Sequence, residues 1–139
     1  MNNDLSPAKI VSKMYNYDLF SKWMGINIMH ISKGKCILEM TVKNEMLNGF
    51  SIAHGGICYS LADSCLAFAA NSHGIKCVSI ETSIRHLKKV KKNDHLTAKS
   101  RELGMDEARA EYEILITNQK GDLVATFKGT VHRTNKKWE

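Results

Sequence analysis

The sequence predicts an α+β fold in which a single antiparallel β-sheet wraps around one long central helix, with a further helix at the N-terminus. Two observations indicate this arrangement. An apolar segment with helical periodicity occupies residues 55–72, and segments in which apolar and polar residues alternate lie before and after it. One sheet that covers the helix is the simplest way to bury the apolar faces of both.

Length and composition favour one soluble domain over residues 1–139. Of the 139 residues, 43% are hydrophobic and 24% are charged, and a chain of this size buries a core without disulfides or metals. No repeat or linker divides the chain, so we expect an N-terminal helical segment at about 6–24 and a core at about 25–134. We see no membrane-spanning run and no secretory signal, and therefore expect a cytoplasmic protein.

The first helix is expected to begin at Ser6-Pro7, because serine is a favoured N-cap and proline a favoured first helical residue. It should break near residues 16–18. The apolar side chains that this segment is expected to bury are Ile10, Val11, Met14, Leu19 and Phe20.

Strands are predicted wherever apolar residues alternate with a period of two. Before the central helix, one strand buries Cys36, Leu38, Met40 and Val42. After the helix we expect four strands, at about 78–84, 96–103, 108–116 and 123–133. The first of these four should bury Val78, Ile80, Thr82 and Ile84. The polar turn at 118–122 makes the last two strands a hairpin.

The central helix should run from Gly55 to Ser72, with Gly74 as its C-cap. Its broad apolar face consists of Ile57, Leu61, Ala62, Cys65, Phe68 and Ala69. A second stripe, at steps of three or four residues, is small or polar and consists of Gly56, Ser60, Asp63, Ala67 and Asn71. Small residues beside a carboxylate leave room for a ligand.

Gly55 and Asp63 together predict hydrolysis of an activated acyl group. Free N–H groups at a helix start polarise a carbonyl, and burial raises the pKa of a carboxyl and makes it a better base. The two residues are separated by about 12 Å along a helix that rises 1.5 Å per residue, too far to act on one carbonyl. We therefore expect a homodimer with antiparallel central helices and active sites shared between the subunits.

Other interpretations of these residues stay open at this point. A Gly-Gly pair before a helix is often only a tight lead into it, whereas Asp63 is less easily dismissed because an unpaired buried charge is costly. His54 can be a helix cap, a core histidine or an acid–base group, and we favour structural support through its ring nitrogens.

The net charge is +6, and the densest basic cluster is the lysine-rich segment 88–92, which is either a solvated turn or a contact for a phosphate-bearing ligand. No aromatic interleaving, zinc finger or RNP-like pattern accompanies it, so we expect no nucleic acid partner. The four cysteines have no metal-ligand spacing and are expected to be small buried hydrophobic residues in a reducing compartment: Cys36, Cys58, Cys65 and Cys77.

Several of these segments resemble the signature of the hotdog-fold acyl-CoA thioesterases, and among them the phenylacetate-degradation (PaaI-type) branch. They are Asn48, His54-Gly55-Gly56, Leu61-Ala62-Asp63 and Asn71-Ser72-His73-Gly74, supported by 46–49 and 127–133. The similarity spans roughly residues 15–133 and implies the hotdog fold, in which a sheet wraps around the central helix.

The resemblance also implies a role for each residue of the motif. The Gly55 N–H would polarise the thioester carbonyl, and Asp63 of the partner subunit would be the general base or the nucleophile. Asn48 would position water or substrate, and His54 would organise the loop rather than react. Gly56 would allow close approach of the ligand.

The remaining candidates concern substrate binding. Ser60 and Ala67, beside the carboxylate, are candidate substrate-binding positions, and Arg85, Lys88 and Lys89 are candidate contacts for coenzyme A. Many relatives place Arg-Pro where this chain has Lys88-Lys89, so the charge is kept but a bidentate phosphate fork is lost. The resemblance further implies a homotetramer made from two dimers.

The implied function is hydrolysis of an aryl- or medium-chain acyl-CoA to the free acid and coenzyme A, with no metal and no cofactor apart from the substrate's own coenzyme A. Two alternatives stay open. One is an acyl-thioester hydratase or dehydratase that uses His54 with Asp63, and the other is a non-catalytic acyl-CoA-binding module. Candidates for the lining of an acyl pocket are Met46, Phe50, Ile52, Tyr59 and Leu66.

Overall fold

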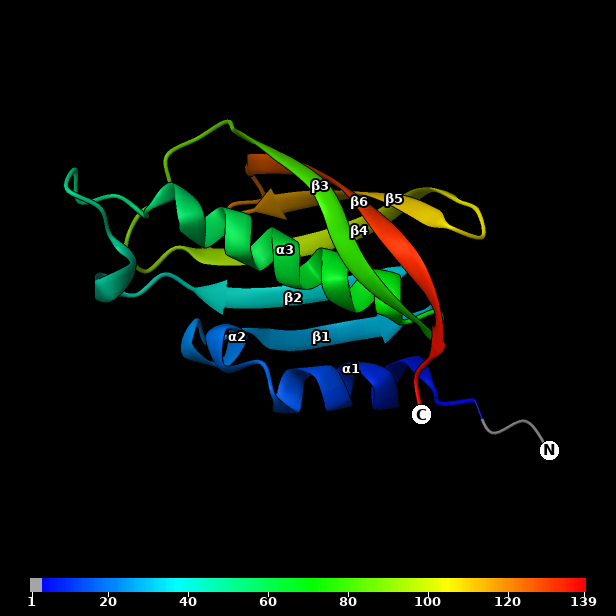
Figure 1. The fold of residues 1–139 in the computed structure, drawn as a ribbon. Coiled ribbons are helices and arrows are strands. Elements are labelled where there is room, and N and C mark those ends of the chain that lie inside the picture. The colour runs from blue at the N-terminus through cyan, green and yellow to red at the C-terminus, as the bar shows by residue number, and fades with distance from the viewer. Residues whose placement is uncertain (1–3) are drawn as a thin grey trace.

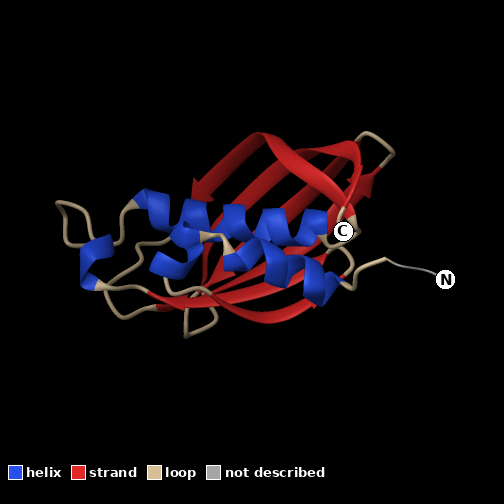
Figure 2. Cartoon of the chain, turned by 60° about the horizontal axis from the view of Figure 1, so that its bottom comes forward, coloured by secondary structure: helices blue, strands red, loops and turns tan. Residues whose placement is uncertain are grey.

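The computed structural model describes residues 4–139, in which the helices gather on one side of a curved six-stranded sheet (Figure 1; Figure 2). The helices are α1 (Pro7–Asn16), α2 (Leu19–Trp23) and α3 (Gly55–Asn71), with a 3-10 turn, η1, at Asn44–Met46. The strands are β1 (Asn27–Ser32), β2 (Lys35–Thr41), β3 (Ile75–His86), β4 (His95–Met105), β5 (Arg109–Thr117) and β6 (Leu123–Lys137). None of the described helices has the length and apolar character needed to cross a bilayer.

The N-terminal helix begins as predicted but buries fewer residues than expected. The Ser6 hydroxyl accepts a hydrogen bond from the Lys9 N–H, and the helix breaks at residues 17–18. Ile10 and Val11 are buried, and Met14 packs against the core.

Leu19 and Phe20, in contrast, are 78% and 54% exposed, so their predicted burial is wrong. The inward face of α2 is taken by Ser21, whose hydroxyl lies 2.6 Å from an Asp18 carboxylate oxygen and 2.8 Å from the Ser64 hydroxyl on α3. This polar contact rotates the short helix so that its large apolar side chains face outward.

The sheet has the order β1-β2-β4-β5-β6-β3, and every neighbouring pair is antiparallel. The four strands after α3 and the β5–β6 hairpin confirm the prediction. Two strands precede α3, however, where one was expected. β1 was not predicted, because its exposed and half-buried residues do not alternate with a period of two.

β3 turns a different set of side chains inward from the one predicted. Val78 and Ile80 are 58% and 51% exposed, whereas Thr82 and Ile84 are half-buried as expected. The pairing of β3 with β6 shifts by one residue between Ser79 and Glu81. Because side chains alternate along a strand, this bulge reverses which face the residues before it occupy.

The core lies between α3 and the concave face of the sheet, and α3 contacts all six strands. The whole predicted apolar face of α3 is buried. The helix ends at Asn71 with Ser72 as its C-cap, so Gly74 is not the cap; it lies two residues beyond the cap with a φ of +97°.

Candidate active site

A histidine caps the first turn of α3. His54 is the N-cap, and its Nδ1 accepts a hydrogen bond of 2.9 Å from the Gly56 N–H. The His54 backbone N–H donates to the Met46 carbonyl at 2.8 Å. His54 is therefore a helix cap, one of the three alternatives considered for it.

Gly55, the first residue of α3, keeps its backbone N–H free: among residues 4–139 no hydrogen-bond acceptor faces it, as expected for the first position of a helix. The capping ring gives Gly56 a further reason to be glycine. A Cβ at Gly56 would lie 3.1 Å from Nδ1 of His54, so the ring approaches this residue closely.

Asn48 shapes the loop that leads into the helix. Its side-chain oxygen accepts from the backbone N–H of Phe50 at 2.9 Å and of Ile52 at 3.4 Å, which leaves only the amide NH₂ for other partners. Farther along this loop, the Ala53 N–H donates to the Val90 carbonyl at 2.8 Å. That bond ties the loop before α3 to the β3–β4 connection.

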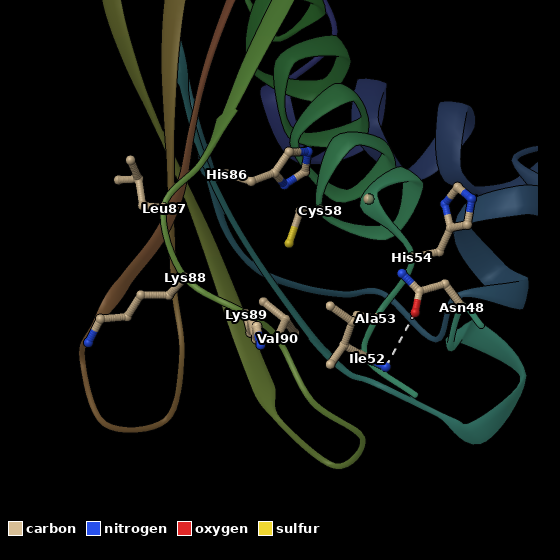
Figure 3. A pocket seen from close by; sticks show the side chains of 11 residues that line it. Asn48, Ile52, Ala53, His54, Cys58, His86, Leu87, Lys88, Lys89 and Val90 are labelled. Carbon is tan, nitrogen blue, oxygen red and sulfur yellow. Dashed lines mark hydrogen bonds between the residues drawn. The ribbon is translucent and has the colours of Figure 1, made fainter. Parts of the chain in front are cut away.

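Between these two segments lies a pocket of about 350 Å³ (Figure 3). Its walls come from Asn48, from 52–55, from Cys58 in α3 and from 86–90. It therefore brings together five of the ten predicted site residues: Asn48, His54, Gly55, Lys88 and Lys89. Among the residues that line it there is no carboxylate.

Asp63 lies two turns farther along α3 and does not line this pocket. Burial raises the pKa of its carboxyl, and the negative charge of Asp18 raises the pKa further. The half-buried Ser60 and Ala67 share its stripe of the helix and are likewise outside the pocket. No group of three or more metal-ligating side chains occurs within residues 4–139.

Asn71, the last residue of that stripe, is a structural residue. Its amide NH₂ donates to the Ala67 and Cys77 carbonyls, and its oxygen accepts from the Cys77 N–H and the Trp138 indole. All of its hydrogen-bonding groups join the end of α3 to β3 and to the C-terminal segment.

The three basic candidates have different surroundings. The Lys88 ammonium lies 3.3 Å from an Asp122 carboxylate oxygen and points away from the pocket (Figure 3). Lys89 is exposed and forms no ion pair within residues 4–139. Arg85 lines a separate surface hollow with Glu113, and is therefore the one basic candidate that the structure keeps apart from the others.

Residues 50–125, more than half of the chain, match the family model described as the thioesterase superfamily. The chain belongs to the thioesterase superfamily. This membership confirms the predicted family and the predicted class of enzyme, the thioester hydrolases.

Individual members of the superfamily are similar over nearly the whole chain. The acyl-coenzyme A thioesterase PaaI of Escherichia coli is 38% identical over 120 residues, which are 86% of this chain and 86% of PaaI. The solved structure of Escherichia coli PaaI, from the phenylacetic acid degradation operon, covers 94% of this chain and 95% of its own at a TM-score of 0.92. It confirms the hotdog fold.

A second solved structure of the superfamily contains coenzyme A. It is a hypothetical thioesterase from Streptococcus pneumoniae, 28% identical, that covers 91% of this chain and 98% of its own with a TM-score of 0.85.

The pocket at the start of α3 also contains two residues that the sequence did not suggest as site residues, His86 and Cys58. Figure 3 shows the His86 ring directed from the end of β3 toward the first turns of α3. Burial raises the pKa of the Cys58 thiol to about 11, so it stays protonated at neutral pH and is a poor nucleophile. No signal in the sequence links His86 to Gly55, because only the pairing of β3 within the sheet brings them together.

Of the five candidates for an acyl pocket, Ile52 alone lines the pocket at the start of α3. Phe50 is 87% exposed, and Met46 and Leu66 are buried in the core. Tyr59 packs edge-to-face on Phe127, with ring centroids 5.4 Å apart.

Proposed function

We propose that the chain is an acyl-CoA thioesterase that hydrolyses an aryl- or medium-chain acyl-CoA in active sites shared by two subunits. One observation carries the proposal: the pocket at the start of α3 has a free Gly55 N–H and no carboxylate, while Asp63, with its raised pKa, lies two turns along the same helix. The similarity to PaaI, an acyl-coenzyme A thioesterase, supports acyl-CoA thioesters as the substrate class.

In the proposed reaction, the Gly55 N–H donates to the thioester carbonyl oxygen at the positive end of the helix dipole. Asp63 of the partner subunit accepts a proton from water, and the water oxygen adds to the carbonyl carbon. The C–S bond then breaks, coenzyme A leaves as a thiolate that takes up a proton, and the acid is released. If the same carboxylate attacks directly, a mixed anhydride forms first and water hydrolyses it.

Two parts of the binding proposal depend on the pocket walls. Lys89 is the basic residue whose charge is available for a coenzyme A phosphate, because Lys88 is engaged by Asp122. A hydrolysis of this kind uses water alone and needs no metal or redox cofactor. The pairing of two dimers into a tetramer stays a prediction, which light scattering of the purified protein tests.

Release of free thiol from a panel of aryl, short, medium and long acyl-CoAs tests this function. We expect the highest kcat/KM for an aryl or medium-chain member. Asp63→Asn should lower kcat about 100-fold or more, the effect expected for loss of a catalytic base. Glu107→Gln, in an exposed turn, removes the same charge elsewhere and should leave kcat unchanged.

The alternatives give different results in the same assay. Loss of enoyl absorbance without any thiol would identify a hydratase and contradict the hydrolase. Tight retention of acyl-CoA with no turnover across the whole panel would identify a binding module.

A further inference from the structure

Gly55 and His86 lie close together in the lining of the pocket. A Cβ placed on Gly55 would lie 3.5 Å from Nε2 and 3.6 Å from Cε1 of the His86 ring. Because N and Cβ of one residue are about 2.5 Å apart, Nε2 lies within about 6 Å of the Gly55 nitrogen. Each donor of a hydrogen bond lies about 3 Å from its acceptor, so one oxygen between the two reaches both.

Both groups are free to bind a ligand. The Gly55 N–H has no acceptor, and the His86 side chain forms no hydrogen bond or ion pair with any residue in the 4–139 range. The His86 side chain is exposed on the wall of the pocket (Figure 3). Nε2 is a donor in the Nε2–H tautomer of the neutral imidazole and in the protonated ring, and the proposal uses this state.

The backbone that carries the ring is fixed by the sheet. His86 is the last residue of β3 and pairs with Ala125 of β6, and the next N–H, that of Leu87, donates to the Val124 carbonyl at 2.8 Å. A donor whose backbone is already in place needs less reorganisation during the reaction than one on a mobile loop.

From this geometry we propose that His86 is a second hydrogen-bond donor to the thioester carbonyl oxygen, opposite the Gly55 N–H. The inference rests on the proposed thioesterase function and names a further catalytic residue for it. His86 transfers no proton: its N–H stabilises the negative charge on the oxygen as water adds, and releases the oxygen when the C–S bond breaks.

The kinetic test compares two variants at this position. His86→Phe keeps a planar ring without a donor and should lower kcat about 100-fold with little change in KM, the effect expected for loss of an oxyanion donor. His86→Gln places an amide N–H near the position of Nε2 and should restore kcat to within about tenfold of wild type. His30→Phe, on β1 at the opposite edge of the sheet, is the control and should leave kcat unchanged.

Three results would overturn the proposal: an unchanged kcat in His86→Phe, an equal loss in the Phe and Gln variants, or a rise in KM alone. A binding measurement separates this failure from that of the thioesterase function. A 2-oxoalkyl-CoA, which keeps a carbonyl, should bind wild type more tightly than the alkyl-CoA thioether of equal length, and His86→Phe should lose this preference. If wild type releases no thiol, the proposed function fails, and equal preferences in wild type and His86→Phe would still refute the donor.

Discussion

Asp63 combines two properties that oppose each other. It lies half-buried on the central helix, where burial and the charge of Asp18 raise the pKa of its carboxyl. A carboxylate in such a place is a better base, but its ionisation costs free energy of folding. A residue chosen only for stability would not carry a charge here.

This conflict predicts a pH-dependent gain in stability for Asp63→Asn. The unfolded chain loses the carboxyl proton at the ordinary pKa of 3.8, and the folded chain loses it only at a higher pH. Ionisation in this window favours the unfolded state, so wild type loses stability relative to the variant as the pH rises through it. Thermal unfolding of both proteins from about pH 3 to about pH 8 measures the difference in Tm.

The difference should grow through that window and stay constant above it. Glu107→Gln, in an exposed turn, serves as the control for removal of a charge. A Tm difference that shrinks as the pH rises would show that Asp63 stabilises the folded state.

At the scale of elements, α3 packs closely on the sheet at Gly129 of β6. A Cβ at this position would lie 2.5 Å from one methyl carbon of Leu66 and 3.2 Å from the other, and 3.3 Å from the Phe127 ring. These neighbours are buried, so the space for an added methyl group has to be made by displacing Leu66. The absence of a side chain at Gly129 thus sets how closely the helix packs on β6.

Gly129→Ala should therefore lower the free energy of unfolding by about 1–3 kcal/mol, the usual cost of overpacking a core. Adding Leu66→Val should recover part of that loss, because the shorter side chain makes room. Urea unfolding of the two single variants and the double variant measures the coupling. Gly104→Ala, in β4 with nothing within 4 Å of the added Cβ, should change stability by less than about 0.5 kcal/mol.

The elements that could be predicted are those whose pattern is complete within their own sequence. α3, β2 and the β5–β6 hairpin show their periodicity locally and were predicted close to their observed bounds. The failures depend on contacts between distant segments. The bulge in β3 exposes Ile80 through its pairing with β6, and Ser21 faces inward because Ser64 of α3 meets it.

The same limit applies to the candidate site. The motif around Gly55 is continuous in sequence, so its residues could be proposed from their spacing and from the resemblance to a known family. His86 reaches the pocket from β3, and Lys88 forms its ion pair with Asp122 in a distant turn. Neither relation leaves a trace in local periodicity.

At the scale of the whole molecule, the two edges of the sheet differ. β1 contacts α1, whereas β3, twelve residues long, is an edge strand that pairs only with β6 within the described chain. An edge strand of this length presents unpaired backbone groups to a second copy. Together with a pocket that lacks a carboxylate, this edge supports the proposed dimer.

Complementation between two inactive variants tests whether the active site is shared. Gly55→Ala places a methyl group between the amide and His86, at ordinary contact distance from the ring, so it should fold but not turn over. Asp63→Asn should be inactive for lack of the carboxylate. When the two are unfolded and refolded together, half of the dimers are hybrids with one intact site, which should restore about a quarter of wild-type activity.

If each chain used its own Gly55 and Asp63, every site in the hybrid would carry one lesion and no activity would return. Refolding each variant alone provides the background rate. Size-exclusion chromatography of the refolded mixture establishes that dimers have formed.

The bond from the Ala53 N–H to the Val90 carbonyl has a consequence for how this protein can diverge. It fixes the distance between the two walls of the pocket through backbone atoms alone, so it does not depend on which side chains the 87–89 segment carries. Gene copies can therefore exchange Lys88 and Lys89 for other residues while the helix start keeps its place. Substitutions in the 87–89 segment can therefore change substrate preference during evolution while the residues at the start of α3 keep their arrangement.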